Sequence, residues 1–180
     1  MNPKDFLYSR FPEELFAAEN SNEYLRRVAQ GASIASSKNV IITGLCRNIM
    51  PVLKYTVARI RKTGELFNDY RVLIYENDSN DGTSQALRKY FQNDNKTTLA
   101  QETTGVPMFS KTRELDRPRY LAGLRNISFE GVRLLNKFFP ADYIIVVDLD
   151  LEGGWSYDGI RHSFSYDNWS AITANGLEYV

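Results

Sequence analysis

The chain has 180 residues, with 22 Lys and Arg against 22 Asp and Glu, and 43% of its residues are hydrophobic. This length suits one domain with a substantial core, and zero net charge gives no general attraction to a polyanion, so we expect no nucleic-acid partner. The single cysteine, Cys46, excludes an intramolecular disulfide and a thiolate-rich metal site. The sequence has neither a run of about 18–20 apolar residues that could span a membrane nor a signal peptide, and we expect a soluble, cytoplasmic chain.

The first 38 residues carry apolar side chains scattered among many charges. This pattern is typical of short amphipathic helices packed on a larger body. The small residues at 31–37 predict a connector. We therefore expect a helical extension over residues 1–38 and the main domain over residues 39–180. Whether that domain is a fragment of a larger protein stays open.

Two strand–helix units follow the extension. Residues 39–44 are a short β-branched run closed by glycine, and residues 51–67 carry apolar side chains at helical spacing. Residues 71–75 predict a second strand, and residues 84–92 predict a second helix. Strands that alternate with helices indicate an α/β fold, which we expect to hold a Rossmann-like mixed, mostly parallel sheet flanked by helices.

The second half of the chain begins with a polar stretch. Residues 93–120 predict a long loop with one short strand near Leu99. Residues 119–138 predict a helix, residues 142–147 a very apolar strand, and residues 171–174 a possible last strand. The apolar face of the helix would comprise Leu121, Leu124, Ile127, Phe129, Val132, Leu135 and Phe138.

Two aspartates follow the apolar strand directly. Asp148 and Asp150 are two residues apart, so they lie on the same side of the chain if it stays extended. Mg²⁺ or Mn²⁺ prefers carboxylate oxygens together with phosphate and water, and such a site implies a phosphate-bearing substrate. The plainer alternative is a strand that ends in an acidic turn.

The run Tyr-Glu-Asn-Asp-Ser-Asn-Asp-Gly-Thr at residues 75–83 follows the second strand and opens the next helix, which Thr83 or Ser84 would cap. In α/β sheets, nucleotides bind in the crevice beyond such strand ends. An acidic loop suits a base or a ribose hydroxyl better than a phosphate, with Asp78 or Asp81 accepting the hydrogen bond. An Asx turn with a helix cap explains the same residues equally well.

Arginines provide the positive charge that a diphosphate requires. Arg47 follows the first strand, and Arg119 and Arg125 lie on the long helix, the latter within Leu-Ala-Gly-Leu-Arg-Asn. The planar guanidinium matches phosphate oxygens. A solvated helix face is the alternative for each of them.

Together, the acidic run at 75–83, Leu-Ala-Gly-Leu-Arg-Asn on the helix and Val-Val-Asp-Leu-Asp-Leu after the later strand resemble the nucleotide-sugar-dependent glycosyltransferases of the GT-A fold. The nearest resemblance is to the fungal capsule-associated mannosyltransferases and to the glycosyltransferase domains of large algal viruses. It covers residues 39 to about 178.

This resemblance implies a role for each matching residue. Asp148 and Asp150 would be the DxD pair, with Asp150 the more direct ligand of Mn²⁺ or Mg²⁺, and Arg125 would lie near the diphosphate or the donor sugar. The base and ribose pocket would be lined by Thr43, Gly44, Arg47, Glu76, Asp78 and Asp81.

Inverting members of this fold use an Asp or Glu beyond the DxD pair as the base that deprotonates the acceptor. Asp158 is our choice because it follows a Gly-Gly-Trp turn; the other candidates are Glu152, Asp167 and Glu178. Inverting and retaining chemistry both stay open.

The leading hypothesis is a metal-dependent glycosyltransferase of the hexosyltransferase type. It would move a sugar from a nucleoside-diphosphate donor, UDP in preference to GDP, to a hydroxyl of a glycan or glycoprotein. The alternatives are a nucleotidylyltransferase and a non-catalytic module that binds nucleotide sugars. The sequence does not determine the oligomeric state.

Overall fold

The computed structural model describes residues 22–106, 108–109, 116–151 and 153–174. In chain order the elements are α2 (Asn22–Ala35), β1 (Asn39–Cys46), α3 (Leu53–Gly64), β2 (Asp69–Asn77), α4 (Thr83–Phe91), β3 (Thr97–Glu102), α5 (Asp116–Phe138), β4 (Tyr143–Val146) and α6 (Tyr157–Ser163). The predicted succession of strands and helices is confirmed from β1 to β4.

The four strands form one sheet in the order β3-β2-β1-β4. Every pairing is parallel, so the described residues contain no antiparallel strand and the expected mixed sheet is all parallel in this part of the chain. Because the strands run in the same direction, their carboxyl ends share one edge of the sheet. We call this the carboxyl edge.

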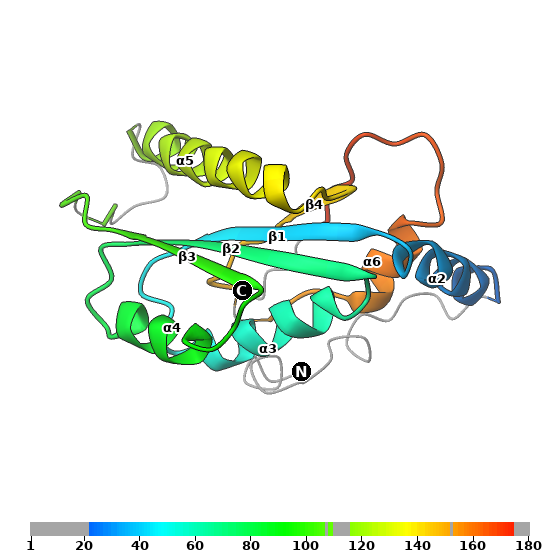
Figure 1. The fold of residues 1–180 in the computed structure, drawn as a ribbon, viewed down its shortest axis with the longest axis horizontal. Coiled ribbons are helices and arrows are strands. Elements are labelled where there is room, and N and C mark those ends of the chain that lie inside the picture. Colours follow the sequence, from blue (N-terminus) through cyan, green and yellow to red (C-terminus); the bar gives the residue numbers. More distant parts are fainter. Residues whose placement is uncertain (1–21, 107, 110–115, 152, 175–180) are drawn as a thin grey trace.

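Helices cover both faces of the sheet (Figure 1). α5 lies over one face, while α3 and α4 lie over the other. The central strand β1 is therefore buried on both sides, and Val40, Ile41 and Ile42 are at most 1% exposed. Parallel strands covered on both faces are expected to be continuous apolar runs, which explains why this strand was visible in the sequence.

The buried face of α5 agrees only in part with the predicted one. Leu124, Ser128 and Val132 are its buried residues, and Val132 packs with Ile41 of the sheet. Three residues of the predicted apolar face are exposed: Ile127 (48%), Phe129 (50%) and Phe138 (88%). The buried surface of α5 is therefore narrower than the distribution of its apolar residues indicates.

α2 packs against α6 at the amino-terminal end of the strands. The predicted connector at 31–37 is wrong over residues 31–35, because α2 continues through Gly31 to Ala35. A Cβ at Gly31 would lie 1.7 Å from the carbonyl oxygen of Arg161. Glycine thus lets the two helices approach closely.

Two local predictions fail. Residues 171–174 form no strand and are exposed. The N-cap of α4 is Gly82, in a left-handed conformation, rather than Thr83 or Ser84. No helix in the described residues is both long enough and apolar enough to cross a membrane.

Candidate functional site

The acid pair lies in a turn at the carboxyl edge, directly after β4. Asp148 and Asp150 are exposed, whereas Leu149 between them is 1% exposed and belongs to the core. The chain is not extended here, because Leu149 and Asp150 form a turn, but both carboxylates are exposed on either side of the buried leucine. They are available to a ligand without any change in the core.

Two contacts anchor this turn to the rest of the fold. The hydroxyl of Thr56 on α3 donates to the carbonyl oxygen of Leu149 over 3.1 Å. On β1, Gly44 faces the turn so closely that a Cβ would lie 2.4 Å from the carbonyl oxygen of Val147. Any larger residue at position 44 would push the turn away from the sheet.

A positive charge lies beside the acids. A guanidinium nitrogen (Nη2) of Arg125 on α5 is 3.7 Å from Oδ1 of Asp148, and both side chains are more than half exposed. An exposed pair of this kind contributes little to stability, so it stays free to rearrange around a ligand. The sequence had placed Arg125 and Asp148 in one site, and the structure brings them together.

In the described part of the chain, no group of three or more His, Cys, Asp or Glu side chains gathers closely enough to hold a metal ion. The acid pair alone offers two carboxylates. A hard divalent cation bound there would need further oxygens from phosphate and water.

The loops after β1 and β2 are bound to each other at the same edge. The backbone N–H groups of Asn48, Ile49 and Met50 donate to side chains of the second loop, at Ser79, Thr83 and Asp81 respectively, each over 3.0 Å. The amide oxygen of Asn48 accepts in return from the N–H of Asn80 over 2.8 Å. These backbone groups are therefore not available as a phosphate cradle.

The carboxylates of Glu76 and Asp81 accept backbone hydrogen bonds within these loops. Glu76 is 3% exposed and accepts from the N–H of Ser79 over 3.0 Å. Burial acts to raise the pKa of Asp81, but hydrogen bonds from Thr83 and Met50 outweigh it and lower that pKa. Both carboxylates have partners in the fold, as the Asx-turn interpretation requires.

Asp78 joins β2 to the segment after β3. Its carboxylate accepts from the hydroxyl of Thr104, from the amide of Asn77 and from the N–H of Gly105. The hydrogen bond from Thr104, the largest cause, lowers the pKa of Asp78 to about 2. The hydroxyl of Tyr120 on α5 lies 3.0 Å from that of Thr104 and completes the network.

Two of the predicted pocket residues on β1 and its loop are also engaged. The buried hydroxyl of Thr43 donates to the carbonyl oxygen of Leu73 over 3.0 Å. It also lies 2.9 Å from the hydroxyl of Ser128. Arg47 is half-buried and donates to the carbonyl oxygen of Val106 over 2.9 Å. Its Nε is buried and has no hydrogen-bond partner among the described residues.

The structure does not bring Asp158 to the acid pair. Asp158 lies in the first turn of α6 and accepts from Arg161 over 2.9 Å. α6 packs against α2 at the far end of the sheet from the acids (Figure 1). Among the other candidates for the base, Glu152 and Glu178 lie outside the described residues.

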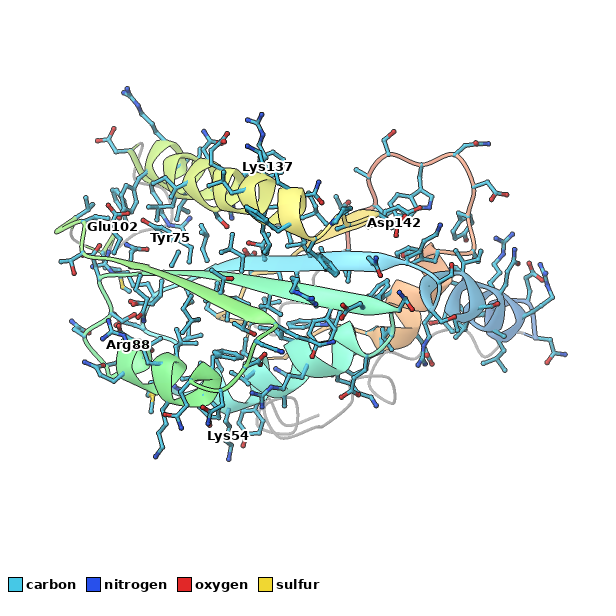
Figure 2. All side chains as sticks on the ribbon, in the orientation of Figure 1. Lys54, Tyr75, Arg88, Glu102, Lys137 and Asp142 are labelled. Carbon is cyan, nitrogen blue, oxygen red and sulfur yellow. The ribbon has the colours of Figure 1, made fainter. Side chains whose placement is uncertain are left out.

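A pocket of about 530 Å³ opens between the end of β3 and the first half of α5. Figure 2 shows Tyr75 and Glu102 near each other at this carboxyl edge. Sequence reasoning missed Glu102, Thr104 and Phe109 because they fall in a polar stretch without periodicity. The remaining lining residues are Asp116, Arg119, Tyr120, Gly123, Leu124 and Ile127.

Comparison of the chain with protein-family models, with curated proteins and with solved structures found no match.

Proposed function

We propose that this protein is a metal-dependent glycosyltransferase that uses a nucleoside-diphosphate sugar. The observation that carries the proposal is the pair of exposed carboxylates at the carboxyl edge, Asp148 and Asp150, held around the buried Leu149 with Arg125 beside them. In parallel α/β sheets, this edge is where nucleotides bind. Paired carboxylates beside a guanidinium suit a diphosphate bridged by a cation.

The donor set fits Mn²⁺ or Mg²⁺. Asp148 and Asp150 supply hard oxygen ligands, and these cations fill their remaining positions with phosphate oxygens and water. When bound, the cation would neutralise charge that develops on the departing nucleoside diphosphate.

The chain's own residues would orient the diphosphate. Arg125 can leave Asp148 for a phosphate oxygen at small cost, because their contact is 3.7 Å long and exposed to water. Meanwhile Leu149 and Thr56 fix the backbone of the acid-bearing turn. Such preorganisation favours binding of the charged donor at this place.

A nucleotidylyltransferase is the less favoured alternative. Enzymes of that class cradle a triphosphate with a basic, glycine-rich loop after the first strand. Here the N–H groups of Asn48, Ile49 and Met50 already bond to side chains, and Arg47 bonds to Val106.

The test replaces one metal ligand. We expect Asp150→Asn to lower Mn²⁺-dependent transfer from UDP- and GDP-sugars by about 100-fold or more, since even the loss of an outer-shell partner of a metal ligand costs about 10–100-fold. Release of the nucleoside diphosphate and calorimetric titration of UDP and GDP with and without Mn²⁺ provide the readouts.

Glu65→Gln is the matched control, because Glu65 is an exposed acid at the end of α3 and, among the described residues, forms an ion pair only with Lys62, over 3.3 Å. It should behave as the wild type. Undiminished transfer by Asp150→Asn would refute the proposal. Release of pyrophosphate from a nucleoside triphosphate would favour the nucleotidylyltransferase, and donor binding without transfer or hydrolysis would favour the binding module.

A further inference from the structure

The pocket between β3 and α5 has apolar walls that stay open to solvent. Leu124 is 6% exposed at its base, and Ile127 is 48% exposed at its rim. The rings of Phe109 and Tyr120 lie 5.5 Å apart at an interplanar angle of 53°. Its volume of about 530 Å³ lies in the range of small-molecule sites, roughly 300–1,000 Å³.

One end of the pocket is lined by polar side chains, and some of their polar atoms have no hydrogen-bond or ion-pair partner among the described residues. Tyr75 donates to Oε2 of Glu102, and burial, followed by this hydrogen bond, raises the pKa of Tyr75 so that its hydroxyl keeps its proton. Among the described residues, Oε1 of Glu102 has no hydrogen-bond partner and Arg119 has no ion-pair partner. The pocket thus offers a strong acceptor at Glu102 and a cationic donor at Arg119, and the carboxylate of Asp116 also lines it.

We propose that this pocket binds the nucleobase of the donor, in the form of a base with a ring N–H, such as uracil or guanine. Phe109 and Tyr120 would pack against the flat ring, Oε1 of Glu102 would accept from the ring N–H, and Arg119 would donate to a carbonyl oxygen of the base. The inference rests on the proposed function for the choice of a nucleobase as the ligand.

This placement differs from the base pocket expected from the sequence, in the loops after β1 and β2. The carboxylates of Glu76, Asp78 and Asp81 already accept hydrogen bonds within the fold. Glu102 still has an unused oxygen.

The pocket and the acid pair lie on opposite sides of the same edge. β3 and β4 are the two outer strands of the sheet, three strand-to-strand steps or about 14 Å apart across the sheet at about 4.8 Å each, and β3 ends farther along because Glu102 is level with Asn77 and Val146 with Leu73. A base bound beyond the end of β3 can thus extend its diphosphate along the carboxyl edge toward Asp148. Arg125 on α5 follows the pocket residue Leu124 directly and links the two regions.

The test uses nucleosides without metal, so that it is independent of the acid pair. Uridine and guanosine are titrated separately into the full chain, with detection by ligand-observed NMR, and the methylated analogues N3-methyluridine and N1-methylguanosine are titrated alongside. We expect at least one nucleoside to bind, and Phe109→Ala to raise its Kd about tenfold or more. Glu102→Gln should reduce the preference for that nucleoside over its methylated analogue.

Phe138→Ala is the matched control, because Phe138 is 88% exposed at the other end of α5. It should leave the Kd unchanged. The inference is overturned if neither nucleoside binds or if Phe109→Ala binds as tightly as the wild type. UDP or GDP binding that needs Mn²⁺ and Asp150 would still stand in each of these cases, so the failure of this inference is distinct from failure of the proposed function.

Discussion

The acidic residues after β2 hold loops together at the carboxyl edge. Asp78 accepts from Thr104, Asn77 and Gly105, and these bonds connect the end of β2 to the segment after β3. Asp78 itself has a positive φ of 53°, a conformation that an aspartate tolerates better than most residues. The sequence showed that Asp78 lies in a turn, but not which of its possible partners it binds.

The pKa of Asp78 predicts a pH dependence of stability. Its value of about 2 in the folded chain lies below the ordinary 3.8, so the contribution of this carboxylate is complete above about pH 4 and is lost as the pH falls toward 2. We expect Asp78→Asn to lower the free energy of unfolding by about 1 kcal/mol at neutral pH, after allowance for solvent exposure. In urea titrations, the gap between wild type and variant should narrow below pH 4. A gap that widened with acid would contradict this assignment.

At the scale of elements, the approach of β1 to the turn after β4 fixes the acid pair. A Cβ at Gly44 would also lie 2.7 Å from Cγ of Leu149. We expect Gly44→Ala to lower the free energy of unfolding by about 1–3 kcal/mol, because a buried contact becomes overpacked. It should also weaken Mn²⁺-dependent nucleotide binding, because the turn that bears Asp148 and Asp150 must move. Urea unfolding and calorimetry measure the two effects.

Gly123→Ala is the control for stability. Gly123 lies inside α5, and a Cβ there meets no atom within 4 Å. Alanine in a helix interior is favoured over glycine by about 0.5–1 kcal/mol. The two substitutions should therefore change stability in opposite directions, and equal effects would show that the close contact at Gly44 is not maintained in solution.

α5 shows how far an element can be predicted from its own sequence. Helical periodicity located the helix, which begins at Asp116 rather than Arg119 and ends at Phe138 as predicted. It identified Leu124 and Val132 of the buried face but missed Ser128, which is buried there through a hydroxyl contact with Thr43, a residue 85 positions away. A polar residue that pairs across the core leaves no mark in a local pattern of apolar residues.

At the scale of the whole molecule, Cys46 reports on the integrity of the fold. It ends the central strand β1, is 4% exposed, and has its pKa raised by burial and then by the nearby charges of Glu76, Asp150 and Asp81. A neutral, buried thiol does not react. We expect a thiol reagent to label native Cys46 at least about 1,000-fold more slowly than the unfolded chain.

Ser37→Cys supplies the internal reference, because position 37 is exposed in the turn before β1. Its thiol should react at the rate of a free cysteine while Cys46 stays protected. Equal rates at the two positions would mean that β1 is open to solvent in the native chain.

The sequence by itself determined the elements whose signal is local. Apolar runs marked β1, β2 and β4; the sheet buries most of β1 and β2, whereas residues of the outer strand β4 alternate between half-buried and exposed. The sequence likewise placed Asp148 and Asp150 directly after the last apolar strand, whereas their exposure was established by the structure. Each of these features depends only on neighbouring residues and the period of a strand.

Only the tertiary structure decided which side chains are available to a ligand. Asp78 and Thr104 meet across 26 residues of chain, and Arg47 meets Val106 across 59. The pocket exists because parallel pairing places the end of β3 beneath α5, and the same fold carries Asp158 to the other end of the sheet. Such pairings follow from the packing of distant elements, and no local periodicity encodes them.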